Sequence, residues 1–167
     1  GFELAVGRWR WTHPGVPSRR AALARALKAA VSLCRLARGA WVEDKGPTFT
    51  VHVRAVRNPA GEAALARRLA AAVRRSGRLA LVPGKRVYEV RPRVDWDKGR
   101  AVERLRRLLA PGAACVYMGD DVTDEDAFRR LKGKALTVTV GHGPSAASHR
   151  VASPAGVRRL LKRLMSS

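Results

Sequence analysis

The sequence predicts an α/β protein in which an α+β segment precedes a segment of singly alternating strands and helices. Up to residue 91, short apolar strands occur in hairpin pairs separated by helices, which is typical of a mostly antiparallel sheet. From residue 92, single strands alternate with helices, which indicates parallel βαβ units. We therefore expect two domains, covering residues 1–91 and 92–167.

The first domain is expected to begin with a strand or hairpin and to continue with two helices and two hairpins. Ser18 could cap the first helix, and Gly39 would end it. In the stretch 48–56, apolar and polar residues alternate, so the polar side chains should share one face. The expected elements are a strand or hairpin at 1–10, a helix at 21–38, strands at 40–45 and 48–56, a helix at 60–76, and strands at 79–83 and 86–91.

The second domain is expected to contain three amphipathic helices and two buried strands. Thr123, with Asp126 three residues later, is a variant of the capping box that starts many helices. Gly119 would permit a tight exit from the strand before it. The expected elements are a helix at 98–109, a strand at 113–118, a helix at 123–131, a strand at 135–140 and a helix at 154–164.

The acidic residues are concentrated in one loop. The chain has 13 Asp and Glu against 34 Lys and Arg, yet the seven residues from Asp120 to Asp126 contain five of the acids. Asp120 and Asp121 directly follow a strand, and ligands of α/β sheets bind at the carboxyl ends of strands. Because Mg²⁺ prefers oxygen ligands, this pair predicts a metal site. Helix N-termini also favour acids, which accounts for Glu125 and Asp126 but not for the adjacent pair.

Lys98 opens the helix that precedes this loop, although the helix dipole disfavours a cation there. Considered alone, it would be an ordinary surface lysine. Beside the acidic loop, a contact with phosphate and with the neighbouring carboxylates explains it better.

The overall composition limits the classes of partner that the protein could bind. A net charge of +21 would attract any polyanion nonspecifically, but the arginines are spread over helix faces and aromatic residues make up only 5%. We therefore expect solvated helix faces and no specific nucleic-acid site. No run of 18 apolar residues occurs, so no membrane span is expected. Cys34 and Cys115 are expected to be buried thiols of a cytoplasmic protein.

Residues 119–128, together with Lys98-Gly99, carry a resemblance to a known family. They read Gly-Asp-Asp-Val-Thr-Asp-Glu-Asp-Ala-Phe and closely resemble the trehalose-6-phosphate phosphatases of the haloacid dehalogenase superfamily. Residues 42–46, 52–54 and 84–92 resemble the family's cap strands, and residues 138–154 resemble its tail. The resemblance covers nearly the whole chain.

The resemblance implies a partial haloacid dehalogenase-like (Rossmannoid) core with an α+β cap domain. It implies Mg²⁺-dependent hydrolysis of trehalose 6-phosphate to trehalose and phosphate. Asp120 would ligate Mg²⁺, Asp121 and Asp124 would support that metal site, and Lys98 would hold the phosphoryl group and the nucleophile. The residues implied to face the substrate are Glu43, Lys45, His52, Arg54 and Glu89, for which a solvent-facing strand edge is the alternative.

The family's nucleophile and general acid/base lie in an Asp-x-Asp-Gly-Thr motif, which these 167 residues do not contain. The first residues look like the interior of a longer protein, so we expect a fragment that is inactive alone and needs the missing N-terminal core half. Its parent would be a free phosphatase or the end of a synthase–phosphatase fusion. The strand at 113–118 would then have an open edge that favours association. A non-catalytic sugar-phosphate-binding relative and a basic nucleic-acid-binding module are the alternatives.

Overall fold

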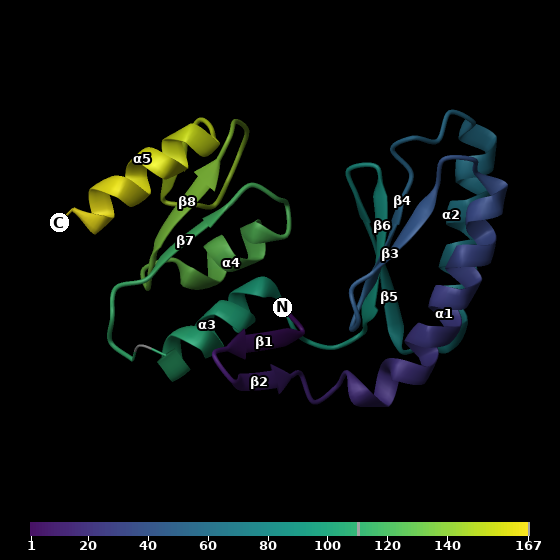
Figure 1. The fold of residues 1–167 in the computed structure, drawn as a ribbon, viewed down its shortest axis with the longest axis horizontal. Coiled ribbons are helices and arrows are strands. Elements are labelled where there is room, and N and C mark those ends of the chain that lie inside the picture. Colours follow the sequence, from purple (N-terminus) through teal and green to yellow (C-terminus); the bar gives the residue numbers. More distant parts are fainter. Residues whose placement is uncertain (110, 167) are drawn as a thin grey trace. The chain divides into compact units, whose positions relative to one another are not determined.

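The computed structural model describes residues 1–109 and 111–166, and the chain divides into two compact units. Phe2–Asp95 form one unit, and Trp96–Ser167 together with Gly1 form the other. The division comes a few residues after the last strand of the hairpin-rich segment. Each unit has its own sheet and its own helices (Figure 1).

The amino-terminal unit alternates hairpins with helices, as the sequence predicts, and all its strand pairs are antiparallel. Short 3-10 turns precede and follow the first α-helix. The elements are β1 (Glu3–Val6), β2 (Trp9–Thr12), η1 (Pro17–Arg19), α1 (Arg20–Leu33), η2 (Cys34–Leu36), β3 (Trp41–Asp44), β4 (Phe49–His52), α2 (Pro59–Ser76), β5 (Leu79–Gly84) and β6 (Val87–Pro92).

The larger sheet of this unit has the strand order β3-β4-β6-β5. Successive side chains of a strand point to opposite faces. Phe49 and Val90 are fully buried on the face that α1 and α2 cover (Figure 1). The register aligns Glu43 with Thr50, and Thr50 with Glu89, on the opposite face. No described helix of this unit covers that face (Figure 1), on which Glu43 and Glu89 flank the buried Thr50.

The starts of the two helices have different causes. The expected cap at Ser18 is wrong, because Ser18 lies inside the 3-10 turn and its hydroxyl donates to the Gly15 carbonyl at 3.3 Å. In contrast, the Asn58 side chain accepts a hydrogen bond from the Ala60 N–H at 3.1 Å, and Pro59 occupies the first helical position of α2. Asn58-Pro59 therefore starts a helix as well as ending the preceding strand region.

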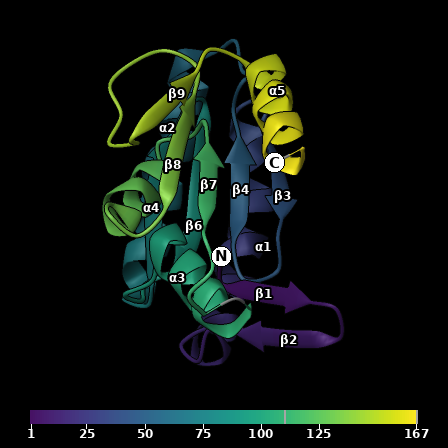
Figure 2. The ribbon, with the colours of Figure 1, turned by 90° about the vertical axis from the view of Figure 1, so that its left-hand side faces the viewer.

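The carboxyl-terminal unit is built around three parallel strands in the order β7-β8-β9 (Figure 2). This confirms the predicted parallel pairing. Strand β9 was not predicted from the sequence, because it has only three residues and no apolar run. The elements are α3 (Lys98–Leu109), β7 (Val116–Gly119), α4 (Asp124–Leu131), β8 (Leu136–Val140), β9 (His149–Val151) and α5 (Pro154–Met165).

Helices α3 and α4 pack closely, and the first turn of α3 lies against Asp126 and Arg130 of α4. A Cβ atom at Gly99 would lie 2.9 Å from the Cβ of Arg130, so only glycine permits this approach. Ion pairs reinforce the contact: Lys134 lies 2.8 Å from Glu103, and Arg130 lies 3.5 Å from Asp97. The packing brings Lys98 within reach of the acidic loop.

Both cysteines are free and half-buried, so they are less buried than the sequence predicts. Burial raises the pKa of the Cys34 thiol. No helix of the described residues is both long and apolar enough to cross a membrane.

Candidate active site

The acidic loop between β7 and α4 folds around one of its own carboxylates. The side chain of Asp124, the first residue of α4, points back toward the end of β7. Its Oδ2 atom accepts hydrogen bonds from the backbone N–H groups of Asp120 at 3.1 Å and Asp121 at 3.0 Å. The loop conformation is therefore held by a side chain that follows the loop in sequence.

The other carboxylate oxygen of Asp124 joins this loop to two further elements. Lys98 Nζ donates to Oδ1 at 2.8 Å from α3, and Tyr117 Oη donates to the same oxygen at 2.7 Å from β7. The Asp124 residue is only 5% exposed. A buried carboxylate with four donors is fully compensated, and it determines where the Lys98 ammonium lies.

The electrostatics of this cluster keep Asp124 ionised. Burial raises its pKa, but hydrogen bonds from Lys98, Tyr117 and the Asp121 amide outweigh burial, so the net pKa lies below the ordinary value. For Tyr117, burial and then the hydrogen bond to Asp124 raise the pKa, so its hydroxyl remains a proton donor. Lys98 thus pairs with a carboxylate that stays ionised in the folded protein.

Gly119 allows the Asp124 side chain to pack directly against the strand. A Cβ at Gly119 would overlap the Asp124 carboxyl group and lie 2.6 Å from the Asp124 Cβ. Gly119 is not among the glycines with positive φ. The sequence-based explanation, a tight exit from the strand, is therefore wrong, because the requirement is close approach of a side chain.

Asp120 and Asp121 are both exposed, but they differ in what they contact. The Thr123 hydroxyl donates to Asp121 at 3.0 Å and does not cap α4, so the predicted capping box is wrong. Asp126, its expected acidic partner, instead pairs with Arg129 at 3.0 Å. The Asp120 carboxylate has no hydrogen-bond or ion-pair partner within residues 1–109 and 111–166.

The carboxylates of the acidic loop meet only part of the ligand requirement of a divalent cation such as Mg²⁺. Among the described residues, no three His, Cys, Asp or Glu side chains are grouped as a metal site. Asp124 uses both its oxygens for hydrogen bonds, whereas the Asp120 carboxylate bonds to none of the residues that the structure describes. Mg²⁺ is usually bound by one or two carboxylates with water and phosphate, so Asp120 fits as one ligand of an incomplete set.

Glu125 links the acidic loop to the connection between β8 and β9. Its two carboxylate oxygens accept hydrogen bonds from the Ser145 hydroxyl at 2.6 Å and from the Ala146 N–H at 2.8 Å. These two bonds lower the pKa of Glu125. Because β7 and β8 are parallel, the connections that follow them both start at the carboxyl ends of the strands. Glu125 joins these two connections.

A second group of polar side chains lies on the uncovered face of the amino-terminal sheet. His52 Nε2 lies 2.9 Å from Glu43 Oε2, and Lys45 Nζ lies 3.4 Å from the same oxygen. The hydrogen bond with His52, followed by that from Lys45, lowers the pKa of Glu43. Glu89 shares this face through its register with Thr50.

Arg54 lies apart from this group. The expected strand at 48–56 ends at His52, and the N–H of Val53 bonds to the Arg86 carbonyl at 3.1 Å. Arg54 therefore falls in the following turn, exposed, with no hydrogen bond or ion pair to the described residues of the group. Arg86 instead holds this turn, since its guanidinium donates to the Val53 carbonyl at 2.8 Å.

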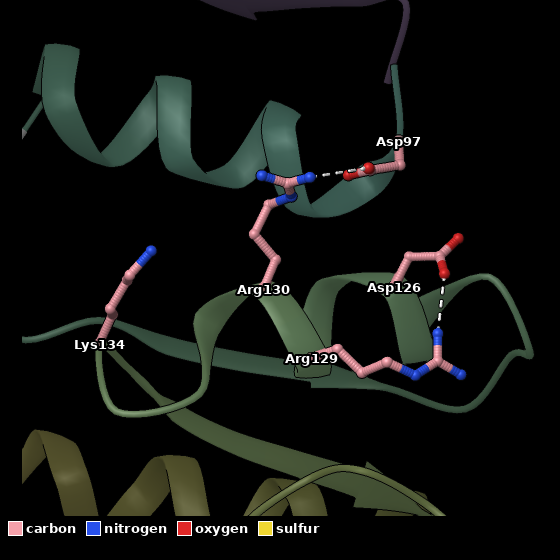
Figure 3. A pocket seen from close by; sticks show the side chains of 5 residues that line it. All are labelled: Asp97, Asp126, Arg129, Arg130 and Lys134. Atoms are coloured by element: carbon pink, nitrogen blue, oxygen red, sulfur yellow. Dashed lines mark hydrogen bonds and ion pairs between the residues drawn. The ribbon is translucent and has the colours of Figure 1, made fainter. Parts of the chain in front are cut away.

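A charged hollow between α3 and α4 is a poor candidate for a phosphate site, although cations line it (Figure 3). Its cations are already paired with acids: Arg129 with Asp126, Arg130 with Asp97, and Lys134 with Glu103 outside the hollow. Local neutralisation removes the attraction that an anion would need.

The sequence model of the trehalose-phosphatase family matches residues 30–156, most of the chain. The chain belongs to the trehalose-phosphatase family. The trehalose 6-phosphate phosphatase RA3 of Zea mays is 36% identical over 134 residues, and the match covers 75% of this chain and 37% of the relative. The chain spans only about a third of the length of the first curated relatives it matches.

Solved structures of related proteins have the same fold as this chain. A crystal structure of a trehalose-6-phosphate phosphatase related protein has a TM-score of 0.84 at 24% identity, covering 98% of this chain and 68% of that one. A haloacid dehalogenase-like hydrolase from Bacteroides thetaiotaomicron has a TM-score of 0.51 at 16% identity, covering 71% of this chain and 44% of that one. These likenesses confirm the predicted fold class, a haloacid dehalogenase-like core with a cap.

Two residues of the candidate site, Tyr117 and Glu125, were not predicted from the sequence. Tyr117 was assigned only to a buried strand, and Glu125 only to the dipole of α4. A tyrosine in a buried strand needs a partner for its hydroxyl, and this need was the available signal. For Glu125 no local signal existed, because its partners, Ser145 and Ala146, lie twenty and twenty-one residues later.

Proposed function

We propose that the chain is the cap domain, residues 1–91, and the carboxyl-terminal core segment, residues 92–167, of a magnesium-dependent trehalose-6-phosphate phosphatase. The intact enzyme would hydrolyse trehalose 6-phosphate to trehalose and phosphate. The observation that carries this proposal is the buried Asp124 cluster, which holds the Lys98 ammonium beside the acidic loop. Membership of the family supports the substrate.

In this proposal Lys98 binds the phosphoryl group, because its side chain is 40% exposed while the ion pair with Asp124 fixes the position of its ammonium. Asp120 would be a direct ligand of Mg²⁺, and Asp121 would support the metal through the loop. The metal, when bound, neutralises charge on the phosphoryl oxygens. Glu43, Lys45, His52 and Glu89 would face the sugar, whose desolvated hydroxyls need paired donors and acceptors.

No Asp-x-Asp-Gly-Thr segment occurs in the 167 residues, so we propose that the nucleophile comes from a preceding core segment. The chain alone is expected to release no phosphate from trehalose 6-phosphate with Mg²⁺. A chimera in which the preceding segment of the Zea mays relative is joined to residue 1 is expected to release phosphate. In the chimera, Lys98→Ala should reduce kcat about a hundredfold or more.

Lys132→Ala is the matched control, because Lys132 is an exposed lysine at the end of α4. It is expected to leave turnover unchanged. Turnover by the chain alone that Asp120→Ala abolishes would overturn the proposed dependence on a missing segment. A folded chimera that binds trehalose 6-phosphate in calorimetry without turnover would favour a non-catalytic relative.

The edge of β7 is proposed as the place where the preceding core segment pairs. Among the described strands, β7 pairs only with β8, and Val116 is 40% exposed. An unpaired edge is a template for another strand. The chain alone is expected to self-associate in sedimentation velocity, and Val116→Lys should reduce this association. Val122→Lys, a change at an 83% exposed loop position, should not. A clean monomer with a cooperative melt would contradict the proposal.

A further inference from the structure

The indole of Trp41 is exposed on the amino-terminal sheet, and none of the contacts described above accounts for a large aromatic side chain there. Trp41 is 53% exposed, although it lies in a strand of the sheet. The register pairs it with His52, and it precedes Glu43 by two residues, so these side chains share the uncovered face. A large aromatic side chain in this position gains little from its own fold.

The indole plane is held by a chain of side-chain contacts. Its ring stacks on the His52 ring with centroids 4.0 Å apart and an interplanar angle of 5°. His52 in turn bonds to Glu43 at 2.9 Å, and Lys45 lies 3.4 Å from Glu43. An apolar ring face, a carboxylate, an imidazole and an ammonium are therefore held within one small area.

This combination matches the chemistry of a sugar ring. A pyranose has an apolar face of C–H groups, for which an aromatic ring supplies contact area, and a rim of hydroxyls that need donors and acceptors. The Glu43 carboxylate is paired with Lys45 and bonds to His52, so this group has little net charge to attract an ion. A neutral ligand group therefore fits this place best.

We propose that Trp41 is a specificity-determining contact for the unphosphorylated glucose ring of the substrate, which stacks on the exposed indole while its hydroxyls bind Glu43 and Lys45. The inference rests on the proposed function. It adds Trp41 to the substrate contacts and assigns it to the unphosphorylated half of the disaccharide. Its occupant is a neutral hydroxylated ring.

The test uses the 167-residue chain and unphosphorylated trehalose as the probe. Trehalose is expected to change the tryptophan fluorescence of the wild type, although three other tryptophans contribute to the signal. Trp41→Ala should remove this change and weaken trehalose binding in calorimetry by about tenfold or more, the range of an aromatic contact. Trp41→Phe keeps a smaller ring and should retain binding within about threefold without the fluorescence change.

Trp9→Phe is the matched control, because Trp9 is also a partly exposed strand tryptophan, at 39%. It is expected to leave both readouts unchanged. Absence of any trehalose-dependent change in the wild type, or equal trehalose affinity in Trp41→Ala, would overturn the inference. In the chimera described above, Trp41→Ala should raise KM with kcat unchanged, a pattern that a loss of folding does not produce.

The two proposals fail separately. If the chimera shows no turnover while trehalose still binds through Trp41, the phosphatase assignment fails and the sugar contact stands. If the chimera turns over and Trp41→Ala has the wild-type KM, the sugar contact fails and the phosphatase assignment stands.

Discussion

Replacing Asp124 with alanine is expected to lower the free energy of unfolding of the carboxyl-terminal unit by about 2–4 kcal/mol, the cost of leaving several donors without their charged acceptor. The change removes the acceptor of Lys98, Tyr117 and two backbone amides at once. Hydrogen–deuterium exchange resolved to residues 96–166 would measure the loss, because it reports each unit separately.

Asp126→Ala is the control for this prediction. Asp126 lies at the same helix start, but its side chain is 51% exposed. Among the described residues it pairs only with Arg129, whose side chain is 64% exposed. Such a surface pair contributes less than about 1 kcal/mol. Equal losses for the two variants would show that the Asp124 cluster does not organise the unit.

Asp124→Asn separates the charge of the carboxylate from its shape. Because the folded-state pKa of Asp124 is held below its ordinary value, its stabilisation is fully present above the unfolded pKa of about 3.9. The stabilisation is lost as pH falls through the folded-state pKa. The difference in stability between wild type and Asp124→Asn should therefore be constant from pH 7 to about 5 and shrink in stronger acid.

Gly119→Ala is expected to destabilise the same unit by about 3 kcal/mol, the upper range for overpacking a filled site. The new methyl group would occupy the space of the Asp124 side chain, with 2.6 Å to its Cβ. Either β7 shifts or Asp124 withdraws from the amides of the loop. Both outcomes misplace Lys98, so the chimera carrying this change should also lose most of its turnover.

A double-mutant cycle shows whether Asp124 is the group that Gly119 accommodates. In an Asp124→Ala background, the overlap with the carboxyl group disappears but the 2.6 Å contact with the Cβ remains, so Gly119→Ala should cost about 1–2 kcal/mol, less than in the wild type. The two changes would then be strongly non-additive in thermal or urea unfolding. Additive losses would mean that Gly119 is needed for another contact.

Sequence pattern was a good guide to elements whose signals are local. The helix predicted at 98–109 has the same bounds as α3, because its amphipathic periodicity begins and ends sharply. The hairpin order of the first unit and the parallel pairing of β7 with β8 also follow from local pattern. The family and its acidic loop could be recognised from residues 119–128, because the whole motif lies in ten consecutive residues.

Tertiary structure alone decided how those residues work together. The donors to Asp124 come from α3, from β7 and from the loop, up to 26 residues away, and packing rather than periodicity brings them together. The Trp41–His52 stack likewise depends on strand register. The sequence by itself determined the elements, the family and the presence of an acidic loop. Only the tertiary structure decided that Asp124 organises that loop, because a carboxylate that is buried on folding is costly unless hydrogen-bond donors surround it.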